Sequence, residues 1–250
     1  MKRFNINEFI WFIILLSFSM YIYYLLSTGK ITLFVHPKLA KYSAFSLVVF
    51  GELTIFQLFK IFTVKTRISF KNGYIFFIAA LIIGIFIAPG GLNSEIGEKK
   101  GITLVSSNSI ENIGKHAHTK EELITGEVIT FNDKYYMHYL EELSEDLDEH
   151  IGKKIIISGY VTKDDKLSSD EFILARMLIN CCAADSQILG ISCRSSLDKA
   201  VKKDSWIIVE GTVSSKENRD KNNKLIGKLP LIEVENITEI KRPGNPYIYE

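Results

Sequence analysis

The sequence predicts a helical membrane anchor followed by a mainly β domain, and three observations lead to this fold class. The 250 residues carry a net charge of +1, yet residues 1–91 hold nine Lys and Arg against two acids, whereas the remainder holds 21 against 27. The first part contains three long apolar runs, and the second contains five runs rich in β-branched residues. The two parts are therefore expected to face different surroundings.

The first part, residues 1–91, is predicted to cross a bilayer three times, with spans at about 9–29, 42–62 and 72–89. A helix needs about 20 apolar residues to cross the hydrocarbon core. The first run meets this length and lacks the small-residue cleavage site of a signal peptide. The second and third runs are short, so an alternative with two crossings and one interfacial helix stays open.

Basic residues set the expected orientation, because Lys and Arg of short loops are retained in the cytoplasm. Three flank one side of the predicted spans, and six flank the other: Lys2, Arg3, Lys60, Lys65, Arg67 and Lys71. The N-terminus is therefore predicted to be cytoplasmic, and the chain after Gly91 to be extracytoplasmic. We expect a multi-pass protein of the cell membrane that contacts the lipid bilayer directly.

Glu52 is the one acid inside a predicted span. A charged carboxylate at mid-bilayer costs about 3 kcal/mol, so its side chain should face protein rather than lipid. Two interpretations stay open: a polar contact with another helix or a transport pathway, and a protonated Glu buried among this chain's own helices.

After a linker at 92–131, the domain at 132–250 is predicted to begin with one helix. Asn132 or Asp133 can cap this helix, and apolar residues recur at three- and four-residue steps as far as Leu147. Five strands are then predicted, at about 153–161, 172–179, 188–193, 205–213 and 231–240.

Five strands suit a small closed or partly closed barrel of the OB-like type, with Gly159 and Gly211 inside strands where a tight bend is needed. OB folds often bind oligonucleotides. Nucleic-acid binding requires a basic surface, however, and this part of the chain is acidic overall. No nucleic-acid partner is therefore expected.

All three cysteines lie in the second part, as Cys181, Cys182 and Cys193. Three interpretations stay open. Free thiols can pack as small apolar side chains. Cys193 can form a disulfide with Cys181 or Cys182 in an oxidising compartment. Alternatively, the thiolates and Asp185 can bind zinc.

His116 and His118 are further weak metal candidates, because two His at this spacing can chelate an ion from an extended segment. The sequence holds no G-x-S-x-G, H-E-x-x-H, P-loop or dinucleotide fingerprint. This absence favours a protein that is not an enzyme.

The stretch from Phe172 to Asp185, FILARMLINCCAAD, resembles the Arg, Cys and Ala-Asp motif of the YcgQ-like family of bacterial membrane proteins. The runs at 152–161 and 206–213 and the ending at 245–249 resemble that family as well. The family is described as a subunit of a two-component permease complex that works beside a larger multi-spanning protein. The resemblance therefore implies a permease partner.

On matching positions the resemblance implicates Arg176, Cys182 and Asp185. A charge-assisted pair between Arg176 and Asp185 would fix the strand end that carries Cys182. Some relatives have a His-rich loop between the second and third spans. Here residues 63–69 read TVKTRIS, without His or Cys, which argues against metal transport.

These inferences predict a non-enzymatic accessory subunit of a permease complex, whose extracytoplasmic OB-like domain contacts a partner or ligand. The expected partner is a multi-spanning membrane permease protein. The alternative is a membrane-anchored thiol or metal (zinc) handling module that acts without a transporter.

Overall fold

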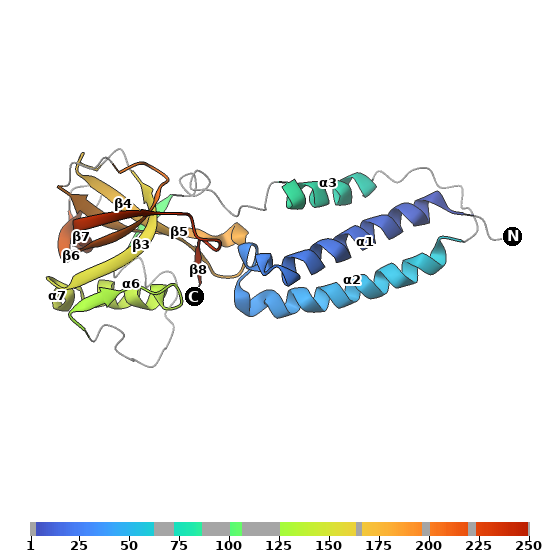
Figure 1. The fold of residues 1–250 in the computed structure, drawn as a ribbon, viewed down its shortest axis with the longest axis horizontal. Helices are drawn as coiled ribbons and strands as arrows, with labels where there is room; N and C mark the ends of the chain where they lie inside the picture. The colour runs from blue at the N-terminus through green and yellow to red at the C-terminus, as the bar shows by residue number, and fades with distance from the viewer. Residues whose placement is uncertain are drawn as a thin grey trace. The chain divides into compact units, whose positions relative to one another are not determined.

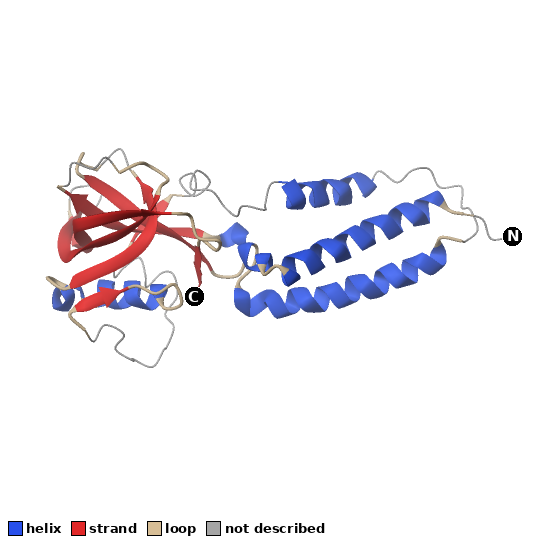
Figure 2. Cartoon of the chain, viewed as in Figure 1, coloured by secondary structure: helices blue, strands red, loops and turns tan. Residues whose placement is uncertain are grey.

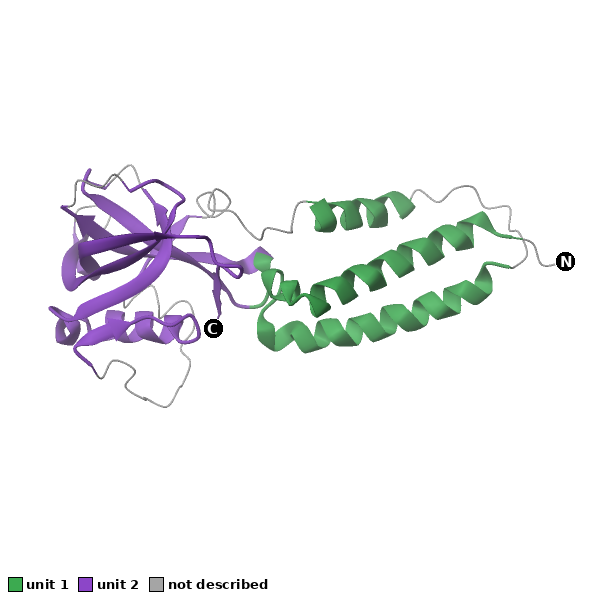
Figure 3. Cartoon of the chain, viewed as in Figure 1, with its two compact units in different colours: residues 1–92, 181–183 green, residues 93–180, 184–250 purple. Residues whose placement is uncertain are grey.

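The structure is a computed structural model that describes residues 4–62, 73–86, 101–106, 126–163, 167–196, 201–219 and 224–249. The chain divides into two compact units (Figure 3). Unit 1 comprises residues 1–92 together with Cys181–Ala183, and unit 2 comprises residues 93–180 and 184–250. Unit 1 is helical and unit 2 is mainly β (Figure 2).

Unit 1 is built on two long apolar helices that run side by side (Figure 1). α1 covers Ile6–Ser27 and α2 covers Ala40–Lys60, and two short 3₁₀ turns connect them: η1 at Lys30–Leu33 and η2 at Pro37–Leu39. The side chain of Asn5 caps α1 by accepting a hydrogen bond from the Asn7 N–H at 3.2 Å. Both helices are long and apolar enough to cross a membrane.

Of the three predicted spans, two therefore correspond to candidate spans in the structure. The third apolar run forms α3, and its described length is 14 residues, Gly73–Phe86. Because about 20 residues are needed to cross the hydrocarbon core, this described length does not by itself make a span. The part of the chain that the structure describes thus holds two candidate spans and one shorter apolar helix.

Polar contacts join the helices of unit 1 on their inner faces. Gln57 of α2 donates a hydrogen bond to the Glu8 carboxylate of α1 at 2.6 Å, and the Ser19 and Thr54 hydroxyls lie 3.3 Å apart. α3 packs on α1 through aromatic side chains, with the Trp11 ring edge-on to Tyr74. These contacts satisfy polar groups that would be costly to expose to lipid.

Unit 2 contains one mixed sheet, and the runs rich in β-branched residues are strands of it, as predicted. Its described strands are β1 Ile102–Leu104, β2 Val128–Thr130, β3 Lys154–Thr162, β4 Glu171–Ile179, β5 Gln187–Ser195, β6 Trp206–Arg219, β7 Leu225–Ile240 and β8 Tyr247–Tyr249. The five predicted strands correspond to β3–β7. β1 and β2 lie in the range expected to be a linker, and each adds a parallel strand to the sheet.

The pairings of the five longest strands form a cycle. β3 pairs antiparallel with β4, β4 antiparallel with β5, β5 parallel with β7, β7 antiparallel with β6, and β6 antiparallel with β3. Each of these strands therefore has a hydrogen-bonded neighbour on both sides. β4, with a paired strand on each side, is buried along its whole length.

A helix precedes β3, as the sequence predicted, although it is divided into α6 at Tyr136–Glu145 and α7 at Leu147–His150. Its inward residues, among them Leu140 and Leu143, belong to the same buried cluster as Ile157 and Leu174 of the sheet. The hydrophobic core of unit 2 therefore lies between this helix and the strands.

Gly211 has the role in the sheet that the sequence suggested for it. It stands at a register shift between β6 and β7, and a Cβ there would collide with the carbonyl oxygen of Glu233. The close approach of the two backbones at this bulge requires a residue without a side chain.

Candidate functional site

Among the described residues of unit 2, Arg176 is the most deeply buried charged side chain, with 1% of its surface exposed. Its side chain lies on the same face of β4 as those of Leu174 and Leu178, which face the core, because side chains alternate along a strand. A guanidinium at such a position is costly unless its donors are satisfied. Hydrogen-bond acceptors are therefore required around the Arg176 guanidinium.

Two aromatic rings enclose the Arg176 guanidinium. Its Cζ lies 5.1 Å from the ring centre of Tyr136 at the start of α6 and 5.3 Å from that of Trp206 at the start of β6. Nη2 donates to the Asp133 carboxylate at 2.8 Å, and Nη1 donates to the Ser158 hydroxyl at 3.2 Å. Among the described residues, Nε has no hydrogen-bond partner.

The partner of Arg176 differs from the one that the sequence suggested. Asp133, not Asp185, accepts its charge-assisted hydrogen bond. Asp133 precedes α6, so the ion pair ties the start of that helix to the middle of β4. Asp185 instead lies in η3 (Ala183–Asp185), after the end of β4.

A second charged cluster lies where β4 and β5 pair. Glu171 is buried and accepts hydrogen bonds from Arg194 at 2.9 Å and from Lys216, while Arg194 also reaches Glu233 at 2.9 Å. Desolvation alone would raise the pKa of Glu171, but the two cationic hydrogen-bond donors outweigh it and hold that pKa below its ordinary value. These ion pairs join β4, β5, β6 and β7, and no pattern in the local sequence indicates them.

Cys193 is a core residue. Its side chain is fully buried, and this burial raises its pKa well above the ordinary value, so the thiol stays protonated. In the β4–β5 pairing, Cys193 stands opposite Phe172, whereas Gln187 stands opposite Leu178. Cys193 and Gln187 are six positions apart along β5, which corresponds to roughly 20 Å.

That separation contradicts the disulfide interpretation. Cys181 and Cys182 follow the end of β4, near Gln187 and far from Cys193, and a disulfide requires Cα atoms within about 7 Å. None of the three cysteines forms a disulfide in the structure. Of the three interpretations, packing describes Cys193, and the other two thiols differ from it in being accessible.

Cys181, Cys182 and Asp185 are brought together. One ligand atom of each lies within 4.8 Å of the other two, with Cys181 and Asp185 exposed and Cys182 half-buried. The donor set, two thiols and a carboxylate, is of the type that zinc accepts. His116 and His118 lie outside the described residues.

Glu52 points away from the other helices of unit 1. It is exposed on α2, whereas Thr54 and Gln57 face α1. Of the two interpretations of this acid, the one that buries it among the chain's own helices is therefore wrong for the described residues.

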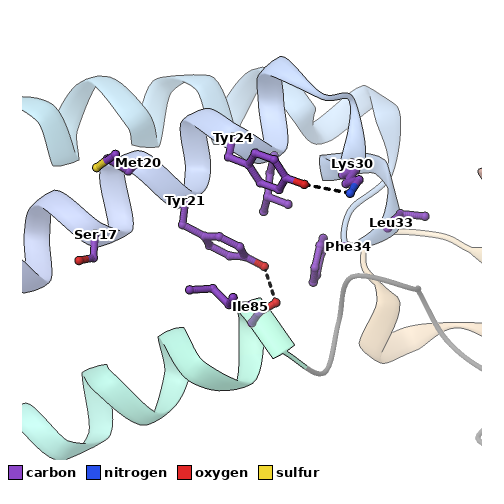
Figure 4. Close-up of a pocket in the computed structure, with 10 residues that line it drawn as sticks. Ser17, Met20, Tyr21, Tyr24, Lys30, Leu33, Phe34 and Ile85 are labelled. Atoms are coloured by element: carbon purple, nitrogen blue, oxygen red, sulfur yellow. Dashed lines mark hydrogen bonds between the residues drawn. The ribbon is translucent and has the colours of Figure 1, made fainter.

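Unit 1 also contains a cavity of about 460 Å³ between α1, η1 and α3, which sequence reasoning did not anticipate (Figure 4). Its wall is mostly apolar. Two tyrosines provide polar points: the Tyr21 hydroxyl donates to the Gly84 carbonyl at 2.7 Å, and Lys30 Nζ donates to the Tyr24 hydroxyl at 2.9 Å. The Tyr21 and Tyr24 hydroxyls are thus both hydrogen-bonded within unit 1 (Figure 4).

Comparison with known proteins gives two relatives by sequence. The YcgQ protein of Bacillus subtilis, a UPF0703 protein, is 20% identical, and the match covers 95% of this chain and 98% of that one. A Streptococcus mutans protein described as a subunit of a two-component membrane permease complex is 25% identical over 46% of this chain and 40% of its own length. The chain thus spans less than half of that second relative.

Among solved structures, the mitochondrial single-stranded DNA-binding protein Rim1 of Saccharomyces cerevisiae matches 36% of this chain and 96% of its own, with 12% identity and a TM-score of 0.23. That score is too low to establish a shared fold or function.

Two family domains match in tandem. The DUF1980 N-terminal domain matches residues 10–103, and the DUF1980 C-terminal domain matches residues 107–250. Together they cover both the helical and the β unit. The chain therefore belongs to the DUF1980 family.

Proposed function

We propose that this chain is a non-enzymatic accessory subunit of a membrane permease complex, anchored by unit 1 and carrying unit 2 as an extracytoplasmic OB-like barrel. The multi-spanning permease is its partner, and the Streptococcus relative described as a permease complex subunit supports this assignment. The excess of basic residues at the expected cytoplasmic loops supports a cytoplasmic N-terminus. The extracytoplasmic placement of unit 2 includes the proposal that the third apolar run, which contains α3 (Gly73–Phe86), also crosses the bilayer.

The exposed carboxylate of Glu52 is the observation that carries the proposal. Its neighbours one helical turn away are apolar and exposed: Val48 by 58%, Ile55 by 60% and Phe56 by 62%. Glu52 lies eight residues before Lys60, roughly 12 Å along the helix axis. That depth places it well inside the hydrocarbon core if α2 spans the membrane.

A carboxylate that faces lipid at this depth is unfavourable by about 3 kcal/mol. Rotation of α2 does not remove this cost. Thr54 and Gln57 fix the opposite face of α2 against α1, since Glu52 and Thr54 stand about 200° apart around the helix. A polar group on a helix of the permease, docked against this face, removes the cost.

The contrast with Glu8 strengthens this argument. Glu8 is the other acid of unit 1, and it accepts a hydrogen bond from Gln57 within the same unit. Unit 1 therefore satisfies one acid internally and presents the other outward. This asymmetry is expected of a subunit whose second acid is satisfied by a different chain.

The test compares Glu52→Leu, Glu52→Gln and the matched variant Glu8→Gln in the full chain expressed in its native membrane. We expect Glu52→Leu to lose co-purification of the multi-spanning partner, because the polar contact is deleted. Glu52→Gln keeps a hydrogen-bonding group, so it should retain the complex if the contact is a hydrogen bond and lose it if the charge itself is required.

Glu8→Gln provides the control, because it perturbs an internal contact of unit 1 and should leave the partner bound. Full complex formation with both Glu52 variants would contradict the proposal. So would equal loss in Glu8→Gln and Glu52→Leu, since that pattern would indicate a general defect of the anchor.

A further inference from the structure

The turn that follows β4 places two accessible thiols beside a carboxylate. The Sγ atoms of Cys181 and Cys182 and one carboxylate oxygen of Asp185 all lie within 4.8 Å of one another, on five consecutive residues. We propose that these three side chains, hereafter the CCD triplet, bind one thiophilic divalent cation of the zinc type. The inference does not depend on the permease assignment.

The spacing suits one tetrahedral ion. Zinc–thiolate bonds of about 2.3 Å and zinc–carboxylate bonds of about 2.1 Å place two bound sulfurs roughly 3.8 Å apart, and a sulfur and an oxygen roughly 3.6 Å apart. The upper limit of 4.8 Å in the structure exceeds these values by about 1 Å. Rotation of the short Cys and Asp side chains covers that difference without a change of the backbone.

The backbone around the two cysteines is held from both sides within unit 1. The His36 N–H donates to the Cys181 carbonyl at 3.0 Å, and the Ala183 N–H donates to the Phe34 carbonyl at 2.8 Å. Cys182 lies between these bonds and forms an antiparallel bridge with Val35. Ligands on an already ordered backbone lose less conformational entropy when they bind an ion.

The triplet is also accessible, in contrast to the third thiol. Cys181 and Asp185 are exposed and Cys182 is half-buried, so an ion can enter from solvent. Cys193 is fully buried, with its pKa raised by desolvation, and takes no part. Three protein ligands leave the fourth position of a tetrahedral ion open, which is typical of exchangeable sites rather than of closed structural ones.

The experiment titrates the tag-free full chain, purified in detergent with a phosphine reductant, with Co²⁺ as a spectroscopic probe. We expect saturation at one ion per chain, with the charge-transfer absorption of cobalt–thiolate bonds and the visible bands of a tetrahedral ion. Added Zn²⁺ should displace Co²⁺ and abolish these bands, because zinc binds such sites more tightly.

Single variants locate the site. Cys181→Ser and Cys182→Ser should each weaken binding by more than the roughly 10- to 100-fold that loss of an outer-shell partner costs. Asp185→Asn should weaken binding and shift the visible bands while keeping both thiolate bonds. Two matched controls, Cys193→Ala for a thiol outside the triplet and Glu239→Gln for an exposed acid on β7, should bind as the wild type does.

A second measurement does not depend on any variant. Zn²⁺ should protect Cys181 and Cys182 of the wild-type chain from alkylation, as read by mass spectrometry of the peptides. The proposal is overturned if the wild type shows no thiolate charge transfer and no protection. It is equally overturned if binding survives replacement of both cysteines by Ser.

Discussion

Arg176 is held by Asp133, a residue 43 positions earlier in the chain, through a hydrogen bond of 2.8 Å from Nη2 to Oδ1. The two side chains differ sharply in exposure, at 1% for Arg176 and 60% for Asp133. Asp133 therefore remains in contact with water while it neutralises a charge inside the domain. The pair, with the rings of Tyr136 and Trp206 on the guanidinium, joins α6, β4 and β6 at one point.

Replacement of Asp133 by Ala should destabilise unit 2 by about 1–3 kcal/mol, because a buried guanidinium then loses its charged acceptor. Asp133→Asn keeps an acceptor oxygen and should cost less. Urea unfolding of the full chain in detergent measures both, with Trp206 fluorescence as the probe in a Trp11→Phe background. Trp206 is well suited because it contacts the guanidinium directly.

The control for this series is Asp148→Ala, which removes an exposed ion pair with Lys228 at 2.6 Å. Exposed pairs contribute about 0–1 kcal/mol, so this variant should unfold nearly as the wild type does. Equal effects of Asp133→Ala and Asp148→Ala would show that burial of Arg176 does not strengthen its ion pair.

The Arg176 site shows where sequence reasoning reached its limit. The periodic apolar pattern placed β3, β4, β5 and the helix before them closely, because these elements are determined by local alternation. It missed the last six residues of β6 and the first six of β7, because these two strands continue to pair beyond their apolar runs. Asp133 was recognised only as a helix cap. Its pairing with Arg176 depends on how α6 packs across the sheet, which no local pattern contains, so the sequence points to the nearer Asp185 instead.

Glu171 should make stability dependent on acid pH. Its pKa in the folded chain lies below the ordinary value for a glutamate. The stabilisation is therefore complete above about pH 4.5 and is lost as the pH falls through the lower folded pKa. Glu171→Gln should lower the free energy of unfolding by about 2 kcal/mol at neutral pH, because Arg194 and Lys216 lose a charged acceptor. The loss should not be larger, because Arg194 and Lys216 are partly exposed to water. In acid, the difference in stability between the variant and the wild type should narrow.

The test measures the unfolding midpoints of the wild type and of Glu171→Gln at several pH values between neutral pH and strong acid. Glu235→Gln is the matched control, since Glu235 also pairs with a lysine but is half exposed. It should show a much weaker pH-dependent difference. A constant gap between Glu171→Gln and the wild type at every pH would contradict the role of the charge.

Gly211→Ala should destabilise unit 2 by about 1–3 kcal/mol, because the added Cβ collides with the Glu233 carbonyl and forces the bulge apart. Gly244→Ala is the control, as no atom lies within 4 Å of its Cβ position. That variant should stay within about 0.5 kcal/mol of the wild type. Thermal unfolding of the two variants side by side decides the matter, and similar midpoints would exclude a tight approach at the bulge.

The two strands in the range 92–131 illustrate a second limit. β1 and β2 have three residues each and pair parallel with β5 and β3. Segments this short have too few residues to show a two-residue period, so their pairing is a tertiary outcome. The outward position of Glu52, by contrast, follows from helical geometry once the α1 contacts of Thr54 and Gln57 are known.

Accessibility to an impermeant thiol reagent should reveal the orientation of the chain. In a Cys181→Ser, Cys182→Ser background, Cys193 stays buried and unreactive. A single cysteine introduced as Glu239→Cys on the exposed face of β7 should be labelled in intact cells. The basic-residue count predicts a cytoplasmic N-terminus, and unit 2 is then extracytoplasmic if the third apolar run also crosses the bilayer. Phe4→Cys, half exposed before α1, should react only after the membrane is opened.

If Glu239→Cys is instead labelled only after the membrane is opened, the β domain lies in the cytoplasm. The CCD triplet would then reside in a reducing compartment, where its thiols stay available for a metal ion without competition from oxidation.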